Sequence, residues 1–568
     1  MKKMFLPLVL VLLFLPITAA PSIQDGTPVA IINGNGGILT SEDLKPFIGV
    51  TRVRLTNAAL IFLENLDLST TAINIDDTQA VIMSNIHWIN FRVNDNLEIE
   101  NVGNVTLNDL TFSNGEVGGI TADSLVEIKN TDQVTISNTY IDNIKPFSGK
   151  SQTNLSIFLF SSVTSITIQD NAFTDINMSY ADLNTKQAIL NISDANTILI
   201  KNNTFSNLST VDPVTFDMNA IKITQSITTS IADNSFLNWN AKFANFYPII
   251  VEAQQATISK NTIHNLNANA IDPITATISE KTTISQNSIN VITFNTETTT
   301  LVQSEAISLI ATKEPNSTAT ISDNTIQNIS ISKGPGGKQF TGIFILADAL
   351  NATLSNNSIQ ATTDGSDSSF NKRLLQGISA FTDATITMIN NSIQLQSDDA
   401  VTAAAITSNF AEITNSTFLA NSTTKAITIS INSRITNSLT KITNNIINAI
   451  APEAEAIMIQ NQGIVNIDQN IINSTKIATS ILTQNNVSIT LTNNKINAPQ
   501  MVYHNSKQID LNCNNNTFNG ETINECLVGN YVFIGNIPLQ KDTIPILLVG
   551  TILLIAIPIL IRKYNNKN

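Results

Sequence analysis

The sequence predicts an all-β protein whose short parallel strands wind into a single-stranded solenoid. Three observations carry this prediction: an asparagine motif that recurs along most of the chain, β-branched runs too short for helices, and turn-forming residues between those runs. The repeats extend over about residues 51–530 of a 568-residue chain. We therefore expect one long repetitive domain with short segments at both ends.

The repeated motif has the form Ile-x-x-Asn-x-(Ile/Phe), as in Ile200-Lys-Asn-Asn203-Thr-Phe205. Most successive motif asparagines are 22 to 37 residues apart, a period typical of solenoids. Asparagine tolerates the left-handed angles of a bend, and its amide can bond to the asparagine of the next coil. Composition alone explains many exposed asparagines, but not one fixed offset. We expect a buried ladder made by Asn171, Asn203, Asn234, Asn261, Asn287, Asn324, Asn357, Asn391, Asn445, Asn470, Asn494 and Asn516.

One period, residues 188–209, illustrates the expected coil. Its three β-branched runs are Ala188–Ile192, Thr197–Ile200 and Thr204–Leu208, bounded by Asn, Asp and Ser. Alternation predicts that Ile198, Ile200, Phe205 and Leu208 point inward, while Lys201 and Ser206 face water. Each strand would pair in parallel with its counterpart one coil away, and parallel crossovers favour a right-handed coil.

The two ends of a solenoid need covers. In the amino-terminal cap, residues 21–50, Thr40-Ser-Glu-Asp43 fits a capping box. Leu44, Phe47 and Ile48 follow at helical spacing, which predicts an amphipathic helix that plugs the first coil.

The carboxyl end contains the only two cysteines, Cys513 and Cys526. In an exported chain one such pair predicts a disulfide that closes the last coil, and two free thiols are the alternative.

Both termini suggest export and membrane attachment. Residues 1–20 have two lysines, an apolar run and small residues, as in a signal peptide. A linker at 531–543 precedes the uncharged apolar stretch 544–561, long enough to cross a bilayer, and the basic tail 562–568. We expect a single-pass cell-membrane protein with its solenoid outside. Sequons such as Asn104-Val-Thr, Asn191-Ile-Ser, Asn351-Ala-Thr and Asn421-Ser-Thr make it a candidate glycoprotein.

With these features the chain resembles the right-handed parallel β-helix proteins of the pectin-lyase-like superfamily, over about residues 50–530. The resemblance implies the fold but no single activity, because that fold carries lyases, hydrolases, phage tailspikes and adhesins. Members that cleave pectin use clustered aspartates with an arginine or a histidine.

Few residues in the sequence match such chemistry. His87, His264 and His504 are far apart in coil order, so we expect no metal site, and no segment indicates a cofactor. The carboxylate pairs Asp76-Asp77 and Asp398-Asp399 are interpreted as turn residues, and no catalytic residue is predicted. The net charge of −14 disfavours nucleic acid as a partner.

One aromatic patch, residues 238–247, makes Trp239 the candidate ligand contact, with core packing as the alternative. The leading hypothesis is a non-enzymatic surface protein, adhesin-like or structural, whose partner is a polysaccharide or another surface protein. A tethered polysaccharide lyase or hydrolase with an unusual site is the alternative, and a self-associating coat subunit is a third. The sequence does not indicate an oligomeric state.

Overall fold

The computed structural model describes residues 18–24, 27–93, 97–117, 124–146, 156–178, 186–210, 217–240, 244–294, 302–312, 317–331, 338–363, 374–433, 438–460, 463–482, 487–505, 509–529, 531–534 and 537–540. The chain divides into two compact units. Unit 1 comprises the residues up to Arg373 together with 379–382. Unit 2 comprises residues 374–378 and the residues from Asp383 onward.

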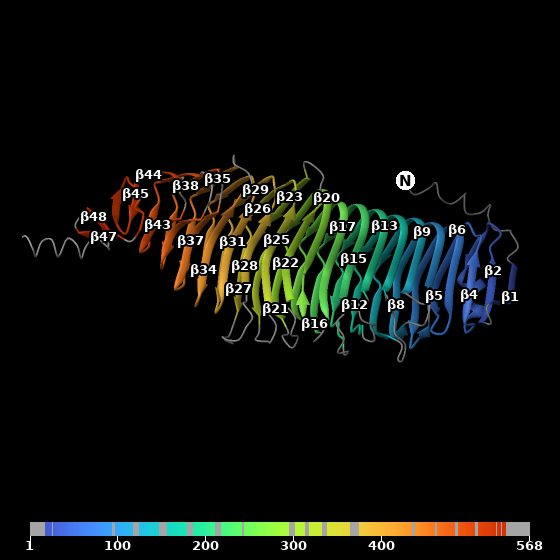
Figure 1. Ribbon diagram of the computed structural model, residues 1–568. Coiled ribbons are helices and arrows are strands. Elements are labelled where there is room, and N and C mark those ends of the chain that lie inside the picture. Colours follow the sequence, from blue (N-terminus) through green and yellow to red (C-terminus); the bar gives the residue numbers. More distant parts are fainter. Residues whose placement is uncertain are drawn as a thin grey trace, which may run out of the picture. The chain divides into compact units, whose positions relative to one another are not determined.

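Unit 1 has one short helical segment near its amino end, and its other described elements are strands (Figure 1). Its elements are β1 (Thr18–Gln24), β2 (Thr27–Asn33), β3 (Ile38–Thr40), α1 (Ser41–Leu44), the 3-10 turn η1 (Lys45–Phe47), β4 (Arg52–Thr56), β5 (Leu60–Asp67), β6 (Ala72–Ile89), β7 (Arg92–Val93), β8 (Leu97–Val117), β9 (Ser124–Ser137), β10 (Tyr140–Pro146), β11 (Ser156–Gln169), β12 (Ala172–Thr174), β13 (Lys186–Lys201), β14 (Thr204–Ser206), β15 (Asp217–Ala232), β16 (Ser235–Asn240), β17 (Asn245–Ser259), β18 (Thr262–Ala268), β19 (Ala270–Ile271), β20 (Ile274–Ser285), β21 (Ser288–Phe294), β22 (Val302–Ala311), β23 (Ser317–Ser322), β24 (Thr325–Ile331), β25 (Lys338–Ala347), β26 (Leu350–Ser355) and β27 (Ser358–Thr363).

Strand β28 (Leu374–Phe381) contributes residues to both units. The strands of unit 2 are β29 (Thr385–Ile389), β30 (Ser392–Ser397), β31 (Ala400–Thr407), β32 (Phe410–Thr414), β33 (Thr417–Ser422), β34 (Lys425–Asn432), β35 (Ser438–Thr443), β36 (Ile446–Ile450), β37 (Glu453–Gln460), β38 (Gly463–Asp468), β39 (Ile471–Ser474), β40 (Ile477–Ile481), β41 (Val487–Thr492), β42 (Lys495–Asn497), β43 (Gln500–His504), β44 (Ile509–Asn514), β45 (Asn516–Phe518), β46 (Glu521–Ile523), β47 (Tyr531–Ile534) and β48 (Ile537–Gln540).

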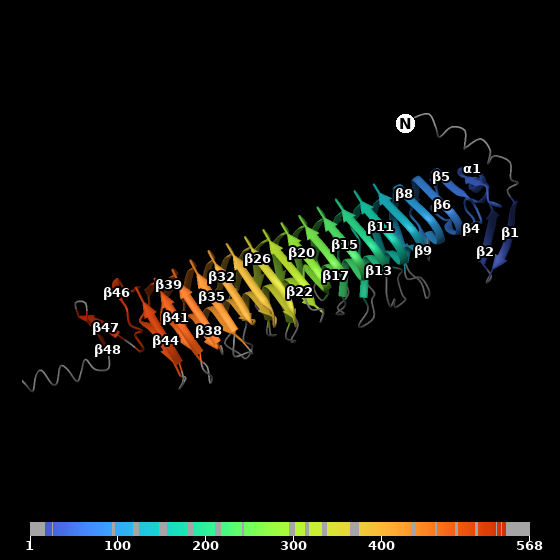
Figure 2. The same cartoon turned by 90° about the horizontal axis from the view of Figure 1, so that it is seen from above.

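Most strands of each unit pair in parallel with the equivalent strands of the next coil, so the predicted all-β solenoid is present (Figure 2). In unit 1, β11 pairs with β13 and β13 with β15, with Ile166 opposite Ile198. In unit 2, β35 pairs with β38 and β38 with β41. The first two predicted strands of the period 188–209 are joined in β13, which bends at Asp194 (φ 53°).

The inside of the coils is apolar. Ile198, Ile200, Phe205 and Leu208 are at most 1 % exposed, as predicted, while Lys201 is exposed and Ser206 is half-buried. Equivalent rings stack from coil to coil: the centroids of Phe173 and Phe205 are 4.8 Å apart, with ring planes 3° from parallel. This distance matches the spacing of neighbouring strands, so each coil places its ring directly on the previous one.

The bends occur at residues with positive φ, and their position corrects one expectation. The residue directly before each ladder position has φ between 51° and 58°, as at Asn202 and Asp233, whereas Asn203 and Asn234 do not. Asn, Asp, Gln and Lys all occupy this corner. The left-handed residue at the bend is thus exposed and variable in type. The buried asparagine that follows it does not adopt the left-handed conformation.

At the amino end the capping box forms, because the backbone N–H of Thr40 donates to Asp43 Oδ2 at 2.8 Å. The helix has only one turn, and Pro46 follows in η1. Leu44 is buried, but Ile48 is 39 % exposed, and Ser41 Oγ bonds to Glu64 O within the first coils. The expected amphipathic plug is therefore reduced to a single turn, and the antiparallel pair β1–β2 lies at this edge.

The carboxyl end of unit 2 changes from parallel to antiparallel pairing at β45–β46, and the hairpin β47–β48 follows within the predicted linker. Within the described ranges, no helix is long and apolar enough to span a bilayer. The predicted membrane segment 544–561, the basic tail 562–568 and residues 1–17 of the predicted signal lie outside those ranges.

Candidate functional site

The predicted ladder asparagines of unit 1 form a continuous hydrogen-bonded chain. Asn203 Nδ2 donates to Asn234 Oδ1 at 3.0 Å, and the Asn203 backbone N–H donates to the same oxygen at 2.9 Å. Asn203 Nδ2 also donates to Ile168 O in the preceding coil. The pattern repeats from Asn171 to Asn357, and each of these side chains is at most 2 % exposed. A ladder of neutral amides thus satisfies buried polar groups at a tight corner.

In unit 2 the ladder has a rung that the sequence motif missed. The 54-residue gap between Asn391 and Asn445 contains two coils, because Ser416 occupies the rung between them. The Asn391 backbone N–H donates to Ser416 Oγ, and the Ser416 N–H donates to Asn445 Oδ1 at 2.9 Å. The flanking apolar residues Ile413 and Phe418 keep the motif offsets, and these could have identified the rung.

Trp239 is a core residue and not a ligand contact. It is 1 % exposed, and its Nε1 donates to Phe205 O at 3.1 Å. Its ring meets Phe236 and Phe246 edge-on at 6.1 and 5.3 Å between centroids. The locally aromatic sequence therefore fills one coil interior.

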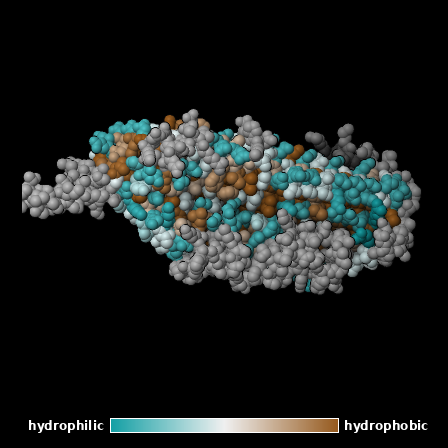
Figure 3. Space-filling model, viewed as in Figure 1, coloured by the Kyte–Doolittle hydropathy of each residue, from teal (hydrophilic) through white to brown (hydrophobic). Residues whose placement is uncertain are grey.

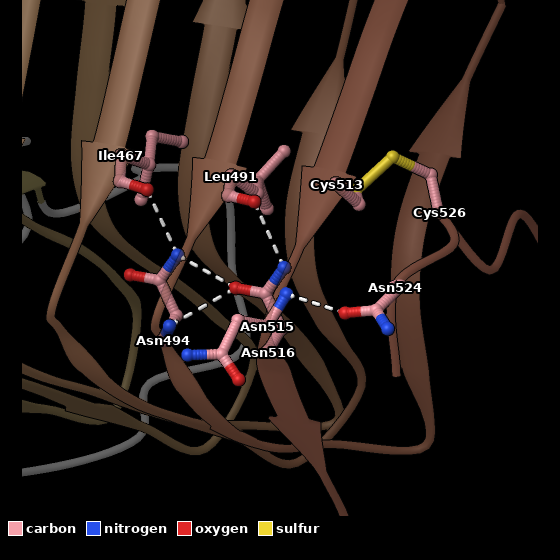
Figure 4. The surroundings of a disulfide bond; sticks show 8 residues. All are labelled: Ile467, Leu491, Asn494, Cys513, Asn515, Asn516, Asn524 and Cys526. Atoms are coloured by element: carbon pink, nitrogen blue, oxygen red, sulfur yellow. Dashed lines mark hydrogen bonds between the residues drawn. A yellow bond between two sulfur atoms is a disulfide. The ribbon is translucent and has the colours of Figure 1, made fainter. Parts of the chain in front are cut away.

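The two cysteines form a disulfide between β44 and the segment after β46, with 5.2 Å between their Cα atoms (Figure 4). Beside it, Asn515 N–H donates to Asn524 Oδ1 at 2.9 Å, and Asn494 and Asn516 continue the ladder to the last coil. A cleft of about 550 Å³ lined by His504, Glu525 and the two cysteines borders this end. The disulfide thus fixes the final segment to the outermost coil.

A second groove lies on the side of unit 2. Asn448, Asn473 and Asn497 occur at the same register of β36, β39 and β42, and Asn473 Nδ2 donates to Asn448 Oδ1 at 2.7 Å. With Ile450, Pro499 and neighbouring residues they line a groove of about 390 Å³. We call these three side chains the amide row. Ile450 is 45 % exposed, so the groove combines stacked amides with an apolar wall.

The surface of unit 2 is mixed in polarity. Figure 3 shows brown hydrophobic residues between teal hydrophilic ones on the face in view. Phe410, Ile446, Ile464 and Ile471 are each at least 41 % exposed, and Ile446 and Ile471 are paired in register. Apolar side chains are therefore also exposed outside the groove.

Unit 1 contains a cluster of three carboxylates and one tyrosine on successive coils. Asp217, Tyr247, Asp272 and Glu305 are half-buried near the starts of β15, β17, β20 and β22, and we call them the acidic strip. The Glu305 N–H donates to Asp272 Oδ1 at 2.8 Å, and Asn245 Nδ2 donates to Asp217 Oδ1 at 3.1 Å. The strip thus places the carboxylates of Asp217 and Asp272 near the Tyr247 phenol, with Glu305 beside Asp272.

The acidic strip changes the protonation of its members. Burial raises the pKa of Asp272 to about 7, opposed by the N–H of Glu305 and assisted by the charges of Glu305 and Asp217. Burial also raises the pKa of Glu305, against hydrogen bonds from Ser308 and Gln303. Burial and the charges of Asp272 and Asp217 raise the pKa of Tyr247. At neutral pH Asp272 can therefore both donate and accept a proton.

Of the carboxylate pairs singled out in the sequence, Asp76-Asp77 lies within β6, and Asp398-Asp399 forms the bend between β30 and β31. Asp76 pairs with Arg54, and Asp77 is a corner residue with φ 48°. No group of three or more His, Cys, Asp or Glu among the described residues is arranged to hold a metal ion.

Sequence reasoning missed both surface sites. The amide row had a visible signal, since Asn445-Ile-Ile-Asn448 and Asn470-Ile-Ile-Asn473 repeat the same four-residue pattern. The acidic strip had none, because the coils that contribute to it differ in length and residue type.

Comparison of the sequence with protein-family models and with curated proteins gives no match.

Proposed function

We propose that the protein is an exported, membrane-anchored, right-handed β-helix of the pectin-lyase-like type that binds a neutral polysaccharide outside the cell without cleaving it. The observation that carries this proposal is the amide row in its groove. The Asn448–Asn473 contact leaves each amide with further donor or acceptor capacity, which suits sugar hydroxyls. Ile450 and Pro499 offer apolar surface to the C–H faces of a sugar ring.

The repeat geometry favours a polymer over a small sugar. Neighbouring strands are about 4.8 Å apart, so the row presents one amide per coil along the direction of stacking. A chain of sugars that lies along it makes several weak contacts at once, and linked contacts raise the overall affinity. The net charge of −14 disfavours anionic polymers, which leaves neutral ones.

The test is binding of purified full-length protein to immobilised neutral and acidic polysaccharides. Asn473→Ala removes the central amide of the row and is expected to weaken binding roughly three- to tenfold, the effect of one hydrogen bond. Asn466→Ala is the matched control, because Asn466 is also a half-buried strand asparagine of unit 2 but lies outside the groove. Equal binding by both variants and the wild type would refute the role of the amide row.

A second candidate is acid–base cleavage of a glycan at the acidic strip. It is favoured by one observation, the raised pKa of Asp272 beside Glu305. A protonated carboxyl can protonate a glycosidic oxygen while a neighbouring carboxylate activates water. Release of new sugar ends by the wild type, lost in Asp272→Asn but retained in Asp233→Asn, would establish this activity. Asp233 is an exposed corner residue with the same charge.

A further inference from the structure

The corner that precedes the ladder contains a recurring sequence of three residues. At five coils an asparagine with positive φ is followed by the buried rung and then by an outward Ser or Thr. These corner asparagines are Asn202, Asn356, Asn390, Asn415 and Asn515. In each case Asn-x-Ser/Thr is complete, so the geometry of the solenoid places an N-glycosylation sequon at one recurring corner.

The corner presents the acceptor amide to solvent while the backbone stays fixed. All five asparagines are exposed, and the backbone N–H of Asn415 donates to Thr443 O at 3.2 Å in the next coil. The side chain of Asn356 bonds to another corner residue, with Nδ2 donating to Asp323 Oδ1 at 2.9 Å. A glycan attached there would extend from a turn without disturbing the core.

The buried rungs are excluded as acceptors by the same geometry. Each ladder asparagine is followed two residues later by an apolar core residue, as in Asn203-Thr-Phe205, so none begins a sequon. Sequons in strands form a third group: Asn191, Asn421 and Asn473 are half-buried within β13, β33 and β39, whereas Asn104 and Asn351 are exposed within β8 and β26. Corner asparagines thus differ from rung asparagines in exposure and from strand asparagines in backbone conformation, although their sequences are similar.

We propose that the corner asparagines are the N-glycosylation sites of this protein and that the strand asparagine Asn421 is not. In the transfer, Asn Nδ2 forms a bond to the anomeric carbon of a lipid-phosphate-linked oligosaccharide. The bond between that carbon and the phosphate oxygen breaks, the lipid phosphate leaves, and the amide gives one proton to a base. The inference goes beyond polysaccharide binding and rests only on the export that the proposed function includes.

The test is glycopeptide mass spectrometry of the full-length protein recovered from the cell surface of a host that glycosylates its exported proteins. Asn415→Gln and Asn421→Gln form a matched pair, since Asn421 lies six residues away in the same coil. Gln is suited to the corner, because Gln286 and Gln469 occupy it with φ of 57°. We expect Asn415→Gln to lose one glycan mass and Asn421→Gln to lose none.

Two results would overturn the inference. One is a glycan on Asn421 with none on the corner asparagines, and the other is the absence of any glycan on surface-exposed protein while other exported proteins of the host carry them. Neither result bears on polysaccharide binding, which is measured separately on Asn473→Ala. Conversely, corner glycans without any polysaccharide binding would leave the modification intact and refute the proposed function.

Discussion

Replacing one ladder asparagine by alanine is expected to open several coils of unit 1 locally. Asn261 is fully buried: its Nδ2 donates to Ile231 O and Asn287 Oδ1, both at 3.0 Å, and its Oδ1 accepts from the N–H and Nδ2 of Asn234. Asn261→Ala removes all four bonds. Asn234 Nδ2 retains Ile200 O and Ala232 O, so two groups lose this partner outright, the Asn234 N–H and Ile231 O.

The magnitude follows from those two groups. Each buried group that loses its partner costs about 1–3 kcal/mol, so the variant should lose about 2–6 kcal/mol of local stability. Because each 1.4 kcal/mol corresponds to about a factor of ten, amide hydrogen exchange should accelerate by roughly 1.5 to 4 powers of ten. Hydrogen exchange is suitable because it reports local opening, which a single melting curve of a repeat protein does not isolate.

The assay compares exchange in β16 to β21 for the wild type, Asn261→Ala and Asn267→Ala. Asn267 lies in β18, the strand that begins directly after Asn261, and its Nδ2 makes one exposed bond to Asn240 Oδ1 at 3.2 Å. Its loss should change stability by no more than about 0.5 kcal/mol. Equal exchange in the two variants would refute the argument that the buried ladder contributes to stability through its hydrogen bonds.

Three further predictions concern other parts of the chain. Replacing both Cys513 and Cys526 by serine should lower the local stability of β44 and β45 by about 2–4 kcal/mol, since the 13-residue loop is no longer closed, and unchanged exchange there would contradict this. Burial raises the pKa of Asp272 to about 7, so the stability from its protonation is complete below about pH 4 and is lost as the pH rises to 7. Asp272→Asn should flatten this pH dependence of exchange in β20, and an unchanged profile would refute it. Val291 is a β-branched residue with φ of 55°, so Val291→Asn should stabilise β21 by about 1 kcal/mol, and destabilisation would contradict the strain argument.

The repetitive part of the fold was predictable because its signal is repeated. The offset between an inward isoleucine and a buried asparagine recurs at each coil, so chance matches are outnumbered by real ones. Ser416 escaped the prediction because it fills the rung with a different residue, although a hydroxyl also accepts and donates there. The corner before the rung was misassigned because it is exposed and tolerates several residue types, which removes any motif.

Single-copy features were predicted less well. The capping box was identified correctly, but Pro46 ends the helix one turn later, so the plug expected from Leu44, Phe47 and Ile48 does not form. Trp239 was predicted to be a ligand contact because it belongs to a local aromatic cluster. Strand alternation instead directs its side chain inward, between Phe236 and Phe246. The amino-terminal helix and Trp239 each occur once in the sequence. No second copy of either feature was therefore present with which to check the prediction.

The acidic strip depends on registers between coils of unequal length. Asp272 and Glu305 are separated by 33 residues in sequence, while Tyr247 and Asp272 are separated by 25. Which carboxylates lie in the strip can be predicted only when the registers that pair β17 with β20 and β20 with β22 are known. Sequence spacing alone does not provide these registers.

The most direct test of the proposed function is the hydrogen-exchange footprint of a bound neutral polysaccharide on the full-length protein. Polysaccharide binding at the amide row predicts slower exchange in β36, β39 and β42, with no change at the acidic strip. Protection confined to β15, β17 and β22, or none at saturating polymer, would contradict the account.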